Sequence, residues 1–163
     1  MFDGRLFLTI LVGACAASQA PVPMVGTAGD VAALSGQWSG EYSSAASGRS
    51  GSISFTLRAA GDSATGDVVM VPTGLGRPLA PWRGETAGAQ PAPAGPEVLT
   101  INFVRVQGGH VSGTLAPYAE PGTGARLITT FVGELSGNTI DGTYTTRLPS
   151  GETQTGRWRV QRR

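Results

Sequence analysis

The sequence predicts an all-β domain, an eight-stranded antiparallel up-and-down meander barrel. Three observations predict this fold. Apolar and polar residues alternate along most of the chain after residue 36, no segment has a convincing helical period, and 25 glycines among 163 residues supply many turns. A chain of this length is one domain that can bury a core.

Eight segments carry the alternation, which is typical of strands that are buried on one face. They are residues 36–42, 52–58, 65–72, 97–106, 110–118, 126–135, 139–148 and 152–163. A weak repeat, in which a Phe is followed by a turn and then by a strand glycine, recurs three times and indicates hairpins in series. Glycines inside strands allow a small sheet to bend sharply.

The connections between these segments are unequal. If the first strand runs upward, the tight turns all lie at the bottom, at 59–64, 107–109 and 136–138. The connections at the top are 43–51, 73–96, 119–125 and 149–151. We therefore expect a closed end with tight turns and an open end with long loops. A two-sheet sandwich, the alternative, predicts no such asymmetry.

The N-terminal segment predicts export. Arg5 precedes a short apolar run at 6–12, which suits a signal peptide and is too short to span a bilayer. Val12-Gly13-Ala14-Cys15 resembles the lipobox of bacterial lipoproteins. The resemblance implies that residues 1–14 are removed, that Cys15 is lipidated, and, because Ala16 is not Asp, that the protein is anchored in the outer membrane and faces the periplasm.

The alternative is an ordinary secretion signal that is cleaved after Ala17 or Ala20, so that Cys15 is discarded. In the lipoprotein interpretation, residues 15–33 form the lipidated cysteine and a flexible tether, and the barrel spans 34–163. A single helical turn capped by Asp30 precedes the first strand. With one cysteine in the chain, no intrachain disulfide can form.

Gly36-Gln37-Trp38, at the head of the first strand, resembles the GxW opening of calycin barrels, the lipocalins and avidins. The resemblance implies that Trp38 plugs the closed end and that Arg162, near the end of the last strand, lies across it. Alternation sends Arg157 and Arg159 outward. Biotin is not expected, because Gly40 and Glu41 follow where avidins carry an Asn.

Composition and motifs favour a protein that is not an enzyme. A net charge of +1 gives no reason to expect nucleic acid as a partner. The 12 arginines, with no lysine, fit either a GC-rich genome or anion recognition. His110 is the only histidine, lies in a tight turn, and has no metal-ligating or catalytic partners in the sequence. No cofactor and no metal are predicted.

Two functions remain. The first is the binding of a small apolar or amphipathic ligand at the open end. Its candidate residues point inward there by alternation, with Trp82 above them: Tyr42, Met70, Trp82, Leu99, Leu127, Thr129, Tyr144, Thr146 and Gln154. The second is an envelope structural or protein-interaction module with a filled barrel, which includes an inhibitor. Trp82, in the long 73–96 loop, is a lid, an anchor for a protein partner, or a plug.

The lipobox generates the first prediction. Cys15→Ser is expected to move the protein from the membrane fraction to the soluble periplasmic fraction, because the acyl chains that hold it can no longer be attached. Fractionation followed by immunoblotting measures this, with Ser18→Ala in the adjacent tether as the control. If the Cys15→Ser variant stays in the membrane pellet, the lipoprotein interpretation is wrong.

Overall fold

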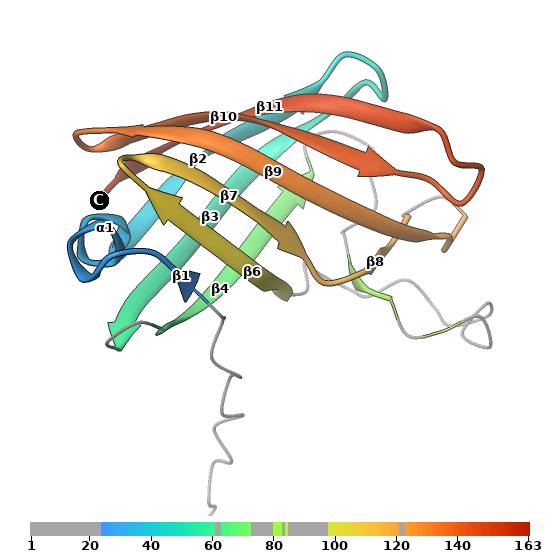
Figure 1. Ribbon diagram of the computed structural model, residues 1–163. Coiled ribbons are helices and arrows are strands. Elements are labelled where there is room, and N and C mark those ends of the chain that lie inside the picture. The colour runs from blue at the N-terminus through green and yellow to red at the C-terminus, as the bar shows by residue number, and fades with distance from the viewer. Residues whose placement is uncertain (1–23, 61–62, 73–79, 83, 85–97, 121–122) are drawn as a thin grey trace, which may run out of the picture.

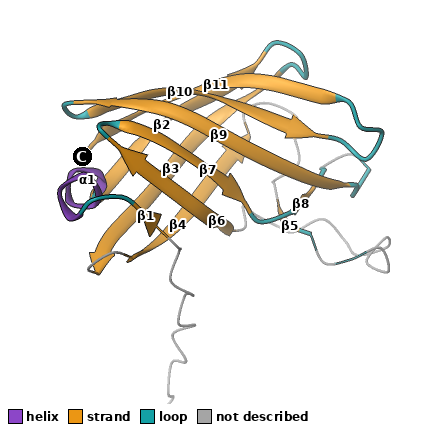
Figure 2. Ribbon diagram, in the orientation of Figure 1, coloured by secondary structure: helices purple, strands orange, loops and turns teal. Residues whose placement is uncertain are grey.

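Strands make up most of the part of the chain that the structure describes, and they curl into one sheet (Figure 1). The computed structural model describes residues 24–60, 63–72, 80–82, 84, 98–120 and 123–163. Strands dominate this described part, and its one helix is seven residues long (Figure 2). The prediction of an all-β domain is therefore confirmed at the level of fold class.

Eight long strands lie close to the eight predicted segments. They are β2 (Gly36–Ser44), β3 (Arg49–Ala60), β4 (Ser63–Pro72), β6 (Val98–Gln107), β7 (His110–Leu115), β9 (Arg126–Ser136), β10 (Thr139–Arg147) and β11 (Thr153–Arg162). The short elements are β1 (Met24–Val25), α1 (Ala28–Leu34), β5 (Ala80–Pro81) and β8 (Tyr118–Ala119). Alternation identifies the long strands because successive side chains of a strand point to opposite faces.

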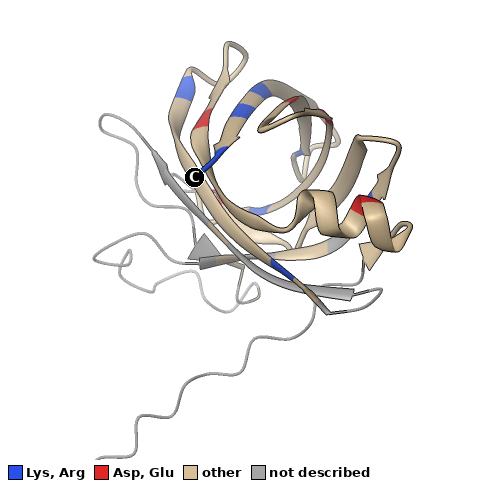
Figure 3. Cartoon of the chain, turned by 90° about the vertical axis from the view of Figure 1, so that its left-hand side faces the viewer, with Lys and Arg blue, Asp and Glu red and all other residues tan. Residues whose placement is uncertain are grey.

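The long strands pair in antiparallel fashion with their neighbours along the chain. The order runs β4, β3, β2, β11, β10 and β9, and β7 joins β9 to β6. The first and last long strands also pair, with Trp38 opposite Arg162. That pairing confirms a specific expectation from the sequence. Viewed from the end that carries α1, the strands curl around an interior (Figure 3).

The sheet differs from the prediction where β4 meets β6. These strands pair over three residues each, 67–69 with 98–100, before β6 bends at a bulge between Ile101 and Phe103. Beyond the bulge, β6 pairs with β1, which runs parallel to it with Met24 opposite Val104. The architecture is thus a curled mixed sheet that forms a half-barrel, and not plainly the closed, wholly antiparallel eight-stranded meander.

Residues that precede the predicted barrel pack against the sheet. The sequence assigns residues 15–33 to the lipidated cysteine and a tether, and within this range Met24 and Val31 are buried. The N-cap of α1 is Thr27 and not Asp30, because the Thr27 hydroxyl accepts the Asp30 backbone N–H at 3.2 Å. The cap orients α1 so that its apolar residues pack on the sheet. Residues 1–23, including the predicted signal peptide and Cys15, lie outside the described residues.

The two ends of the sheet carry connections of different length. Two-residue turns, at 108–109 and 137–138, lie at the end that also holds α1, which we call the helix end. The described connections at the opposite end, which we call the loop end, are 45–48, 116–120 with 123–125, and 148–152. Among the described connections, those at the loop end are therefore longer than those at the helix end.

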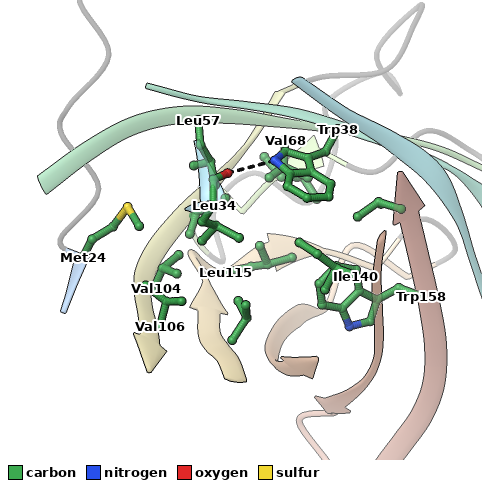
Figure 4. Packing of buried hydrophobic residues seen from close by; sticks show 14 of the residues in the cluster. Met24, Leu34, Trp38, Leu57, Val68, Val104, Val106, Leu115, Ile140 and Trp158 are labelled. Atoms are coloured by element: carbon green, nitrogen blue, oxygen red, sulfur yellow. Dashed lines mark hydrogen bonds between the residues drawn. The ribbon is translucent and has the colours of Figure 1, made fainter. Parts of the chain in front are cut away.

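Aromatic rings lie over strand glycines in the interior. An ideal Cβ on Gly142 would lie 2.4 Å from the Trp158 Nε1 atom, and one on Gly156 would lie 2.2 Å from the Tyr144 ring. These glycines therefore make room for the rings. The surrounding apolar cluster, drawn in Figure 4, includes Met24, Leu34, Trp38, Leu57, Val68, Val104, Val106, Leu115, Ile140 and Trp158.

Trp38 and Arg162 pack against each other at the helix end, in a contact that we call the helix-end seal. The buried Trp38 donates its indole N–H to the Leu34 carbonyl at 2.9 Å. The Arg162 Cζ atom lies 4.5 Å from the centre of the Trp38 ring. The same guanidinium donates to the carbonyls of Ala33 and Ser35, at the end of α1. The predicted contact is confirmed, and the positive charge has both a π face and carbonyl acceptors beside it.

This seal generates the second prediction. Arg162→Ala is expected to lower the free energy of unfolding by roughly 2–4 kcal/mol, because it removes a cation–π contact and two hydrogen bonds that join α1 to the sheet. Arg159→Ala is the matched control. Arg159 is exposed and pairs only across the surface with Asp141, at 3.4 Å, so a loss below about 1 kcal/mol is expected. Equal losses in urea denaturation would contradict the assigned role of Arg162.

Candidate functional site

Most of the predicted ligand-binding residues converge at the loop end. The side chains of Tyr42, Leu99, Leu127, Thr129 and Thr146 are buried, and those of Tyr144 and Gln154 are half-buried. They come from five strands, β2, β6, β9, β10 and β11. The antiparallel registers of β2, β11, β10 and β9 bring the residues of these four strands onto neighbouring strands. The Met70 side chain and most of the 73–96 loop lie outside the described residues.

A chain of hydroxyl groups is buried in this cluster. The Thr129 and Thr146 side chains are directly opposite each other on β9 and β10, and their Oγ1 atoms are 2.7 Å apart. The Tyr118 hydroxyl lies 2.9 Å from Thr129 Oγ1. Because each of these hydroxyls has a hydrogen-bonded partner, the polar atoms can be buried without a large desolvation penalty.

All three tyrosines of the chain lie at this end, around the hydroxyl chain. The Tyr42 and Tyr144 rings meet edge to face, with their centres 6.4 Å apart. Burial raises the pKa of Tyr42 to about 12, and the neighbouring phenols of Tyr144 and Tyr118 add to that rise, while the positive charge of Arg49 opposes it. Burial also raises the pKa of Tyr144, against a hydrogen bond with Ser44 and the charge of Arg49. The cluster therefore favours neutral phenols.

Tyr118 was missed by the sequence prediction because the strand alternation breaks before it. Leu115 is the last buried residue of β7, and an unbroken strand would turn residue 118 outward. The chain instead leaves the strand at Ala116-Pro117 and restarts as β8, which sets Tyr118 inward against β9. The proline was the available signal, since it interrupts a β ladder.

A charged pair lies at the rim of the cluster. Arg49, at the start of β3, forms an ion pair with Glu120, which follows β8. The other carboxylate oxygen of Glu120 accepts the backbone N–H of Thr123 at 2.6 Å and its hydroxyl at 3.0 Å. The sequence prediction named neither Arg49 nor Glu120, because both stand in loop-like segments with no periodicity to orient them.

Trp82 lies at the same end and is half-buried. Its backbone N–H donates to the Pro117 carbonyl at 3.0 Å, and its ring centre lies 5.4 Å from Arg126 Cζ. The β5–β8 pairing holds this stretch beside the β8 segment. Trp82 is therefore joined to the rim at the loop end and is not a freely exposed side chain.

Other chemistry-bearing groups lie away from the cluster. His110, at the helix end, is exposed, and its Nδ1 atom lies 2.5 Å from the Glu134 carboxylate. Within the described residues, no group of three or more His, Cys, Asp or Glu side chains could hold a metal ion. Likewise, none of the helical residues described forms a segment long and apolar enough to cross a membrane.

No protein-family model, curated protein or solved structure matches this chain. Any assignment of function must therefore come from the geometry of the chain itself.

The buried phenols generate the third prediction. Because the folded-state pKa of Tyr42 is raised, its contribution to stability is complete below the ordinary value of 10.0 and is lost as the pH rises towards about 12. Tyr42→Phe should remove that part of the alkaline loss, since it has no phenol to ionise. Urea denaturation below and above pH 10, together with phenolate absorbance, measures both effects. An unchanged alkaline loss of stability in the variant would show that Tyr42 is not its source.

Proposed function

We propose that this protein is an exported, lipid-anchored, calycin-like barrel that binds a small amphipathic or apolar ligand at its loop end. The observation that carries the proposal is the contrast between the two ends. The helix end is sealed by Trp38, Arg162 and α1. The loop end gathers phenol rings and buried hydroxyls among apolar side chains, next to a half-buried tryptophan. A few polar groups within apolar walls are typical of small-molecule sites.

The calycin-like part of the proposal is supported by the first and last long strands. The β2–β11 register sets Trp38 opposite Arg162, and the guanidinium lies over the indole. In the proposed barrel the short β4–β6 ladder completes the circuit of strands, assisted by β1. A closed circuit of strands would enclose the interior and leave the loop end as its accessible opening.

The character of the side chains at the loop end limits the ligand. Leu99 and Leu127 provide apolar wall, while Thr129, Thr146 and Tyr118 provide hydroxyls without formal charge. A buried charge on the ligand would lack a counter-ion among these groups, which is costly. We therefore expect the apolar part of the ligand to lie inside and any charged part to lie at the rim.

The proposed anchor would keep this site near a membrane. Nine residue steps separate Cys15 from Met24, and an extended chain of that length spans at most about 30 Å. Since Met24 is buried against β6, little further slack is available. A lipidated Cys15 in the outer membrane would thus hold the domain close to a lipid surface on its periplasmic side, where amphipathic molecules are concentrated.

The half-buried Trp82 would serve as a lid over the ligand at the loop end.

The second candidate is an envelope structural or protein-interaction module with a filled interior, with the 73–96 loop as the partner surface. One observation favours it. Every buried side-chain nitrogen or oxygen in the described residues already has a hydrogen-bonded partner. A filled interior needs no ligand to satisfy its polar groups.

The fourth prediction separates these two functions. Native mass spectrometry of the protein purified from its own membranes is expected to show a bound small molecule. Gln154→Trp, which adds a ring at a half-buried position of β11 facing the cluster, should abolish that extra mass. Thr155→Trp is the matched control, because the neighbouring residue is exposed and faces outward. A native protein that carries no extra mass, and that fails to bind added amphiphiles, would favour the filled module.

A further inference from the structure

The Arg49–Glu120 ion pair joins two parts of the sheet that are not neighbours. Arg49 opens β3, which pairs with β2 and β4. Glu120 lies between β8 and β9, and β9 pairs with β7, β8 and β10. No ladder connects β3 to β9, so the ion pair bridges the loop end from one side to the other. It lies at the rim of the cluster formed by Tyr42, Tyr118 and Tyr144.

The two partners of this ion pair are held differently. The Arg49 side chain keeps 36% of its surface exposed, whereas Glu120 keeps 16%. Glu120 is also tied to its own loop through the Thr123 N–H and hydroxyl. The positive charge of Arg49 lowers the pKa of both Tyr42 and Tyr144, in opposition to the effect of burial, so the guanidinium lies near both phenols. The segment between β8 and β9 thus holds the Glu120 carboxylate against Arg49, at the rim of the candidate site.

We propose that Arg49 binds the carboxylate head of an amphipathic ligand, and that Glu120 occupies the same position in the free protein. This inference rests on the proposed ligand-binding function and names the class of ligand, a carboxylic acid with an apolar tail. On binding, the ligand carboxylate replaces that of Glu120 on the guanidinium. The tail extends past the tyrosine cluster towards Leu99 and Leu127.

The exchange of the Glu120 carboxylate for that of the ligand is physically reasonable, because Arg49 has a negatively charged partner in both states. The guanidinium is paired with a carboxylate before and after binding, so Arg49 itself is never left as an uncompensated charge at its half-buried position. The planar guanidinium can accept a carboxylate in two parallel hydrogen bonds, a geometry that favours this head group over a neutral hydroxyl. The displaced Glu120 carboxylate keeps the hydrogen bonds that it accepts from the Thr123 N–H and hydroxyl, and these stabilise its negative charge.

This arrangement makes Glu120 an intramolecular competitor of the ligand. A carboxylate tethered beside its partner has a high effective concentration, which lowers the apparent affinity of any external carboxylate. Removing the competitor should therefore tighten binding, whereas removing Arg49 should weaken it. A merely structural ion pair predicts no such opposition, because either substitution would loosen the same contact.

The test uses the full mature protein and two fluorescent probes, dansylaminoundecanoic acid and its methyl ester, which share one tail. Wild-type protein should bind both and prefer the acid. Arg49→Gln should weaken the acid by roughly tenfold and leave the ester nearly unchanged. Glu120→Gln should bind the acid several-fold more tightly. Arg147→Gln is the control. Arg147 is exposed and is the last residue of β10, at the loop end, so this variant should bind both probes as the wild type does.

Two controls distinguish a loss of binding from a loss of folding. Thermal unfolding shows whether each variant is folded, and Arg49→Lys keeps the positive charge at this position. A folded Arg49→Lys variant with an affinity for the acid between those of wild type and Arg49→Gln would support the proposal. Equal binding of acid and ester by the wild type, or weaker acid binding by both Glu120→Gln and Arg49→Gln, would overturn the assignment of Arg49 and leave the ligand-binding function standing. Binding of neither probe would overturn both.

Discussion

The pairing of β2 with β11 is the constraint on which the rest of the structure depends. It brings the first and last long strands together and so separates an inward face from an outward one along the whole sheet. Arg162 secures that pairing from the last strand by lying over Trp38 and donating to the end of α1. Gly36 is required at the same place, because its φ of +132° is unfavourable for other residues and an added Cβ would lie 2.8 Å from an Arg162 nitrogen.

Alternation predicted the long strands and the direction of their side chains because burial on one face imposes a period of two on the sequence. It also turned Arg157 and Arg159 to solvent, as the structure has them. The contact of Arg162 with Trp38 was expected from the resemblance to calycin barrels. Alternation failed where the period is broken by non-local effects. β1 is only two residues long, too short for alternation to reveal. It forms because Met24 and Val25 pair with β6, a contact that the local sequence does not predict.

The candidate site was partly predictable for the same reason. The residues on regular strands, such as Thr129 and Thr146, follow the alternation and meet across β9 and β10. Arg49 and Glu120 could not be oriented from the sequence, because their places depend on an ion pair between residues 71 positions apart. Tyr118 was missed because alternation was continued across Pro117, where the strand breaks. The polar chemistry at the rim therefore comes from the connections, while the cluster beneath it comes from the strands.

The parallel strand β1 has a consequence for how the protein survives proteolysis. Met24 and Val25 cover a stretch of β6 that β4 does not reach. A protease that cut the chain just after this strand, near the exposed Gly26 and Thr27, would free that stretch of edge while leaving α1 and the longer strands covalently intact. Exposed backbone donors and acceptors of this kind recruit strands from other molecules. Shedding of the domain from its N-terminal segment would thus uncover a strand edge and make the domain prone to strand exchange and aggregation.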